Sequence, residues 1–185
     1  MTIRHSLLCA SRLFSTILST LAAAAFTASV FAAEALPDDA VLETRIAAAF
    51  TTNEDYADTL IRVNSHRGFI LLTGQVPRTE LKSQATNTVV FASSAIRRII
   101  NELEVVATVD TSTADVDAAL EATIDDTLQA LDPPPAAPVE VVVHKGVVYL
   151  LGAVENTEAQ RLATRISTIG GVANIRTVFE IMPQN

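Results

Sequence analysis

Two histidines are the first side chains in the sequence that could do chemistry, because an imidazole can bind a metal ion or transfer a proton near neutral pH. His66 and His144 occupy matching contexts, each followed by a basic residue and a glycine. A metal or acid–base site would also need a further histidine, a cysteine or a defined carboxylate cluster, and the sequence around them offers none. Polar residues beside tight turns are the favoured interpretation, so we predict no metal site and no cofactor.

Two pairs of adjacent acidic residues, Asp38–Asp39 and Asp125–Asp126, could be taken for paired catalytic carboxylates. Neighbouring residues of a helix point in different directions, so solvated charge and helix-end electrostatics explain these pairs better. The sequence also has no Gly-x-Ser-x-Gly elbow and no glycine-rich phosphate loop between a strand and a helix. We therefore predict a protein without enzymatic activity and without a small-molecule substrate. A hydrolase site hidden in the loops is the weaker alternative.

A segment of the second half of the chain could bind a lipid or a partner. Arg161 and Arg165 lie one helical turn apart, and the helix runs into Ile169 and Gly170. Arginines beside exposed apolar residues could hold a lipid headgroup while a nonpolar tip enters the membrane interface. The alternative is an ordinary amphipathic helix, in which Arg161 pairs with Glu158 and Arg165 is solvated, and the residues alone favour this alternative.

The charge balance excludes one class of partner. The chain has 185 residues, 21 acidic and 13 basic side chains and a net charge of -8, and 49% of its residues are hydrophobic. An acidic chain without a basic run is unsuited to nucleic acid, because phosphate binding needs lysines and arginines. The hydrophobic content argues against disorder and suffices for one domain or two small ones.

Residues 1–33 have the pattern of a secretory signal peptide. Arg4 and Arg12 precede an uncharged stretch over 13–33, which ends in small residues before the first acidic side chain. An uncleaved anchor is the less favoured alternative, because the stretch is rich in Ala, Ser and Thr. The only cysteine, Cys9, precedes the apolar stretch, whereas a lipoprotein cysteine follows it. We expect an exported periplasmic chain without a lipid anchor.

The rest of the chain contains an internal sequence repeat with two copies. A shift of 78 residues brings the second copy onto the first, and beyond residue 86 the shift becomes 76. The matched pairs include Asp39 with Asp117, Leu42 with Leu120, His66 with His144, Gly68 with Gly146, Gly74 with Gly152 and Thr79 with Thr157. We therefore expect two domains, over residues 36–106 and 113–182.

Hydrophobic periodicity predicts the same order in both copies: helix, strand, strand, helix, strand. The apolar positions of the first helices are Leu42, Ile46, Ala49 and Phe50 in one copy and Val116, Leu120, Ile124 and Leu128 in the other. The later elements are expected over 61–66, 69–76, 79–92 and 99–105, and over 139–144, 147–154, 157–169 and 175–181. Asp39 and Asp117 are expected to complement the positive ends of the helix dipoles.

Several glycines are predicted to have structural roles in turns and strands. They are Gly68 and Gly146 in the hairpin turns, Gly74 and Gly152 in the returning strands, and Gly171 after the last helix. The pattern predicts an α+β fold of two tandem αββαβ modules, each a small three-stranded mixed sheet covered on one face by two helices. Such small domains are marginal alone, so contact between the copies is plausible. The proline-rich stretch 132–138 is interpreted as a stiff spacer, with a recognition peptide as the alternative.

These features resemble the BON domain, a module of bacterial envelope proteins. Leu72-Thr-Gly74-Gln-Val76 and Leu150-Leu-Gly152-Ala-Val154 match its strand pattern, and Gly170-Gly171-Val172 matches its end in the second copy. The first copy departs from the pattern, because Ser93-Ser94-Ala95-Ile96 stands where the glycines are expected. The resemblance covers nearly all of the chain after residue 33.

The resemblance implies a periplasmic or outer-membrane-associated protein, like the family's osmotically inducible and outer-membrane lipoprotein members. It implies phospholipid binding, support of envelope integrity or assistance to other envelope proteins, without enzymatic activity. We therefore expect a non-enzymatic envelope-maintenance or stress protein that binds phospholipid or an outer-membrane component, in the periplasm or peripheral to the outer membrane. The alternative is a soluble chaperone-like or protein-binding module without lipid contact. The sequence assigns no oligomeric state.

Overall fold

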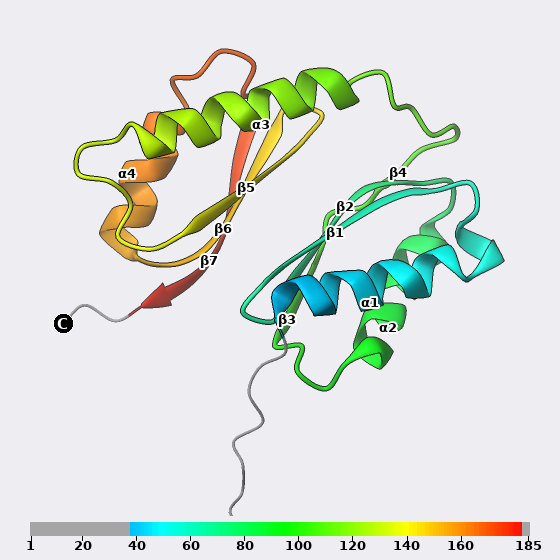
Figure 1. Cartoon of the computed structure of the whole chain (residues 1–185). Coiled ribbons are helices and arrows are strands. Elements are labelled where there is room, and N and C mark those ends of the chain that lie inside the picture. The colour runs from blue at the N-terminus through cyan, green and yellow to red at the C-terminus, as the bar shows by residue number, and fades with distance from the viewer. Residues whose placement is uncertain (1–37, 183–185) are drawn as a thin grey trace, which may run out of the picture. The chain divides into compact units, whose positions relative to one another are not determined.

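A computed structural model describes residues 38–182, which fall within one compact unit (Figure 1). The predicted signal peptide, residues 1–33, lies outside the described residues. Within residues 38–182, none of the helices combines the length and the apolar character needed to cross a membrane.

Both copies fold with the same order of elements. Module one, the first copy, contains α1 (Asp39–Thr51), the short 3-10 helix η1 (Glu54–Tyr56), β1 (Leu60–His66), β2 (Phe69–Val76), α2 (Thr79–Ala92), β3 (Arg98–Asn101) and β4 (Glu104–Val105). Module two, the second copy, contains α3 (Ala114–Gln129), β5 (Val139–His144), β6 (Val147–Glu155), α4 (Asn156–Ile166) and β7 (Asn174–Met182). The predicted α+β fold of two tandem αββαβ modules is confirmed.

Each sheet is mixed and is organised around one central strand. Strand β2 pairs antiparallel with β1 and parallel with β3 and β4, and β6 pairs antiparallel with β5 and parallel with β7. The third strand of module one differs from its counterpart, because it is broken between β3 and β4. There the buried Leu103 joins the core, and the side-chain amide of Asn101 donates to the Lys82 carbonyl of α2 at 2.7 Å.

The helices cover one face of each sheet, as the apolar periodicity predicts. Alternate residues of the central strands point toward them, namely Ile70, Leu72 and Val76 of β2 and Val148, Leu150 and Val154 of β6. The helical residues that meet them are Leu42, Ile46, Phe50, Leu81, Ala85 and Val89 in module one and Leu120, Ile124, Leu128, Ala159, Leu162 and Ile166 in module two. Each module therefore has its own hydrophobic core.

The opposite faces of the two sheets form a third apolar cluster that joins the modules. Leu71 of β2 is buried with Val142, Tyr149, Leu151 and Val178 of module two. The central strands are consequently buried on both faces. Among the described residues, five ion pairs surround this contact: Arg62 with Glu121 at 2.9 Å, Arg97 and Arg67 with Glu180 at 2.8 and 3.4 Å, Lys145 with Glu104 at 2.7 Å and Arg176 with Glu102 at 3.2 Å. Because exposed ion pairs contribute only about 0–1 kcal/mol each, the apolar cluster dominates the contact and the charges fix its register.

An aspartate at the start of each module's first helix holds the hairpin turn. Asp39 accepts hydrogen bonds from the Ser65 hydroxyl and from the Arg67 backbone N–H at 2.7 Å. Asp117 accepts from the backbone N–H groups of Lys145 and Gly146 at 2.7 and 2.9 Å. Burial raises the pKa of Asp39, but these hydrogen bonds outweigh it and hold the pKa below its usual value. The repeated aspartates thus do more than complement a helix dipole.

One expectation for the core is wrong. Val116, expected on the apolar stripe of α3, is 68% exposed, whereas the neighbouring Asp117 is buried. The turn of Lys145 and Gly146, with φ of 50° and 72°, presents backbone donors that only an acceptor can satisfy. The helix therefore turns its acidic residue inward, and Val116 lies in solvent.

Candidate functional site

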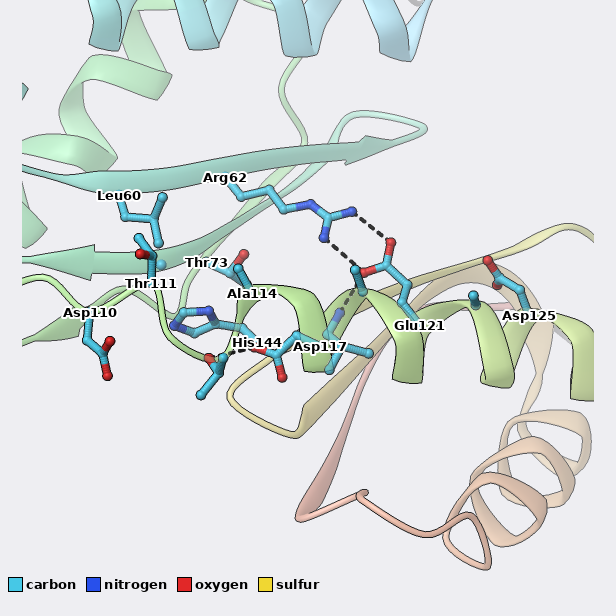
Figure 2. A pocket seen from close by; sticks show the side chains of 15 residues that line it. Leu60, Arg62, Thr73, Asp110, Thr111, Ala114, Asp117, Glu121, Asp125 and His144 are labelled. Atoms are coloured by element: carbon cyan, nitrogen blue, oxygen red, sulfur yellow. Dashed lines mark hydrogen bonds and ion pairs between the residues drawn. The ribbon is translucent and has the colours of Figure 1, made fainter.

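A cleft of about 360 Å³ lies beside the first turns of α3 (Figure 2). Strands β1 and β2 contribute one wall, and α3, β5 and the preceding segment contribute the other. Its lining residues are Leu60, Arg62, Thr73, Gly74, Asp110, Thr111, Thr113, Ala114, Asp117, Ala118, Glu121, Ala122, Asp125, Val143 and His144. Small alanines on the cleft face of α3 leave this space open.

Two of the α3 carboxylates that line the cleft, Asp117 and Glu121, are engaged in structural bonds. Glu121 accepts two hydrogen bonds of 2.9 Å from the Arg62 guanidinium, drawn as dashed lines in Figure 2, and one of 3.1 Å from the Val143 backbone N–H. Asp117, one turn earlier, holds the hairpin turn and also accepts from the Thr113 hydroxyl at 3.1 Å. Both carboxylates are therefore committed to bonds that hold a hairpin turn and an ion pair.

Two other side chains that line the cleft are His144 and Asp125. Among the described residues, the buried Nε2 atom of His144 has no hydrogen-bond partner. Burial lowers the pKa of His144, so the neutral imidazole is favoured. Burial, with the nearby charges of Glu121 and Asp126, raises the pKa of Asp125. Both pKa shifts favour the uncharged form of the side chain.

The geometry provides no assembled catalytic or metal centre in the part of the chain that the structure describes. Across residues 38–182, no group of three histidine, cysteine, aspartate or glutamate side chains is placed to hold a metal ion. In the same range, no hydrogen bond links His144 to a hydroxyl or a carboxylate that could form a nucleophile–base pair. Asp125 and Asp126 are separate side chains of α3, and only Asp125 lines the cleft.

The four residues proposed from sequence as a lipid site lie at α4 and just beyond it. The Arg161 guanidinium donates to Glu158 at 2.8 and 2.7 Å and to the Pro133 carbonyl at 3.0 Å, so it ties α4 to the proline-rich segment. This pair holds the pKa of Glu158 below its usual value. Arg165 is exposed, Ile169 packs partly against the core, and Gly170 is exposed with open space around it. Lipid binding at these residues stays a prediction.

The structural glycines lie at close approaches of the backbone. At Gly74, with φ of 120°, a Cβ atom would come within 1.9 Å of the Leu60 carbonyl oxygen. At Gly68 a Cβ atom would come within 2.7 Å of the Ala95 carbonyl oxygen. Gly146 approaches the Gly171 carbonyl, Gly152 lies under the Phe179 ring, and Gly171, with φ of 96°, contacts Leu120.

Sequence reasoning missed an apolar site at the end of α2. Phe91 is 88% exposed and Val90 is 54% exposed, the first being the most exposed of the large hydrophobic residues described. A hollow of about 400 Å³ beside them is lined by Val90, Ser93, Ser94, Ile96, Arg97, Arg98 and Ile99. The available signal was the missing glycines at residues 93–94, because a helix without a glycine stop can continue.

Comparison with known proteins identifies the same domain in both copies of the repeat. The family model of the BON domain matches residues 38–107 and 116–183. The chain is 27% identical over 146 residues to the outer membrane lipoprotein DolP of Haemophilus influenzae, covering 78% of this chain and 75% of that protein. It is 25% identical over 143 residues to the 21 kDa hemolysin of Actinobacillus pleuropneumoniae, covering 77% and 73%. The solved C-terminal domain of CdsD, a structural protein of the Type III secretion system of Chlamydia trachomatis, matches at 14% identity and a TM-score of 0.31, covering 79% of this chain and 68% of that chain.

Proposed function

The chain belongs to the BON domain family, and we propose that it is a non-enzymatic protein of the bacterial envelope that binds phospholipid or an outer-membrane component. Both modules carry the family pattern, which supports a binding role for the pair. The proposed location is the periplasm, with the protein free there or peripheral to the outer membrane, after export by residues 1–33.

The observation that carries this proposal is the extent of the likeness to an outer membrane lipoprotein. The alignment runs over 146 residues, whereas the family model matches module one over residues 38–107 alone, so the alignment extends into both modules of this chain. The role of its relative is a property of that protein, and we extend the envelope location to this chain as part of the proposal. A fold likeness alone would say little about function.

The chemistry of the cleft supports binding in preference to catalysis. Its carboxylates Asp117 and Glu121 each accept three hydrogen bonds, which hold the module-two hairpin turn in the case of Asp117 and include the bonds to Arg62 of module one in the case of Glu121. Withdrawing either group to serve as a general base would disrupt a hairpin turn or an ion pair. The proposal therefore assigns these groups to structure and the function to surface contact.

Two measurements on the full chain test the proposal. Fractionation of the producing cells should place the protein in the envelope, and lipid extracted from the purified protein should contain phospholipid. The purified protein should also float with vesicles in a density gradient. Absence of flotation with anionic and with zwitterionic vesicles would remove direct lipid binding.

The same preparation distinguishes the alternative function. A chaperone-like module would delay the aggregation of an unfolded outer-membrane protein and would crosslink to it, with or without vesicles. If the protein neither floats nor protects such a client, both versions of the proposed function are excluded.

A further inference from the structure

The second helix of module one is longer than its counterpart. Helix α2 runs for 14 residues to Ala92, whereas α4 runs for 11 residues to Ile166. Counted along the helices from the matched Thr79 and Thr157, Ile166 stands at the position of Thr88, so α2 continues for one further turn, residues 89–92. In module two the chain turns instead through Gly170 and Gly171. The serines of module one impose no such stop, and the extra turn carries Val90 and Phe91.

This extra turn places a large apolar side chain in solvent. Val89 is fully buried and anchors the turn to the core, while Phe91 is 88% exposed. Counted from the matched Thr79 and Thr157, Phe91 stands at the position of Ile169 in module two, which packs partly against the core. The exposed phenyl ring therefore has no structural role in the fold that the structure describes, and its exposure is unfavourable in water unless something covers it.

The charge around the extra turn differs from that of the whole chain. Residues 81–101 contain three basic residues and no acidic residue, within a chain of net charge -8. Arg98 is exposed and, among the described residues, makes no ion pair. Arg97 and Arg67 share Glu180, and the Arg97 guanidinium also lies 5.2 Å from the centre of the Phe69 ring. This end of module one is therefore locally basic and apolar together.

We propose that the end of α2 is the membrane-contacting tip of the protein, with Val90 and Phe91 entering the interface of an anionic phospholipid bilayer and Arg98 pairing with a lipid phosphate. This inference rests on the proposed function. It places the lipid contact on module one, whereas the sequence suggested one at α4 of module two. An exposed aromatic residue beside a cation suits the boundary between headgroups and acyl chains.

Charge complementarity favours an anionic bilayer over other occupants. The net negative charge of the chain repels an anionic surface as a whole, so attraction requires a local cationic region turned toward the lipid. The unpaired Arg98 and the shared Arg97 and Arg67 meet that requirement. Arg161, by contrast, is occupied by Glu158 and the Pro133 carbonyl.

Vesicle flotation with single variants of the full chain tests the tip. Phe91→Ser should reduce partitioning onto vesicles roughly tenfold, because the phenyl ring loses its burial in the interface. Arg98→Glu should reduce partitioning onto phosphatidylglycerol-containing vesicles by roughly tenfold, and it should leave binding to phosphatidylcholine vesicles unchanged. Thermal unfolding of both variants should match the parent protein, since both side chains are exposed.

Two matched variants locate the contact. Val116→Ser removes another exposed apolar residue, at 68% exposure, and should leave flotation unchanged. Arg165→Glu makes the same charge change on α4 and should have less effect than Arg98→Glu. If the parent protein floats and Phe91→Ser floats equally well, or if only Arg165→Glu impairs binding, the tip is wrong while the proposed function survives. If the parent protein does not float, the lipid function itself fails and the tip fails with it.

Discussion

The second helices of the two modules begin at matching positions and end differently, although the same sheet lies beneath each. Helix α2 buries Leu81, Ala85 and Val89, at a spacing of four residues. Helix α4 buries Ala159, Leu162 and Ile166, at spacings of three and four. Counted from the matched Thr79 and Thr157, the residues of α2 at the positions of Leu162 and Ile166 are Gln84 and Thr88. The two helices therefore present different faces to equivalent cores.

This difference shows which parts of a duplicated fold are constrained. The central strands and hairpin turns keep the same residue at several matched positions, such as Leu72 with Leu150 and Gly68 with Gly146, because each must satisfy a backbone pattern and a core at once. A helix covering the sheet can rotate, provided that some apolar stripe meets the core. In α2 the apolar stripe continues to Val89, which requires the longer helix. The surface residues of that last turn can therefore serve another role.

The largest expected effect tests the rotation of the helices directly. Ile166→Ala should reduce the free energy of unfolding by about 3 kcal/mol, because it removes a fully buried side chain and leaves a cavity. Thr88→Ala, at the corresponding position of α2, should change it by less than about 0.5 kcal/mol, since the Thr88 hydroxyl bonds only to the Gln84 carbonyl of its own helix. Urea unfolding of both variants measures the two values. Equal losses would mean that the helices present the same face.

A smaller effect tests the helix ends. Ile169→Ser should destabilise the protein by roughly 1–2 kcal/mol, because Ile169 packs partly against the module-two core. Phe91→Ser should stay within about 0.5 kcal/mol of the parent. Thermal unfolding at fixed protein concentration distinguishes them. A marked loss of stability in Phe91→Ser would show that the ring is covered within the protein and not available to a membrane.

Much of this fold could be predicted from the repeat. The strand and hairpin positions follow from alternation around Gly68 and Gly146, and two copies in register reinforced each other. The inward orientation of Asp117 could not be predicted, because it depends on donors in a turn that lies 28 residues away in the chain. Helical spacing alone therefore assigned Val116 to the core incorrectly.

The contact between the modules was only partly accessible from sequence. The runs Ile70-Leu71-Leu72 and Leu150-Leu151 indicate strands buried on both faces. They do not say what covers the second face. For the candidate sites, the pairing of Arg161 with Glu158 follows from a spacing of three residues on a helix. Its bond to Pro133 needed the fold, as did the exposure of Phe91, which depends on where α2 ends.

The smallest effect concerns a position where the modules carry opposite charges. Arg62 of β1 and Glu140 of β5 correspond in the repeat alignment, and Glu140 accepts a hydrogen bond of 2.7 Å from the Asn64 side chain. Burial raises the pKa of Glu140 despite this hydrogen bond. The ionised form of Glu140 therefore destabilises the folded state, and this destabilisation is complete at pH values above the raised pKa. It disappears once the pH falls below the ordinary glutamate pKa of about 4.3.

Glu140→Gln should accordingly stabilise the protein slightly at pH 7, because the amide oxygen can still accept from Asn64 while the buried charge is removed. The gain should vanish near pH 4, where Glu140 is protonated in both folded and unfolded chains. Glu180→Gln provides a control of opposite sign, since Arg97 lowers the pKa of Glu180 and its charge stabilises the folded state. That variant should be less stable at pH 7, and its deficit should shrink as the pH falls through the lowered pKa. Urea unfolding across this range measures both, and two variants shifting in the same direction would mean that net charge, not the local pairing of the modules, sets their stability.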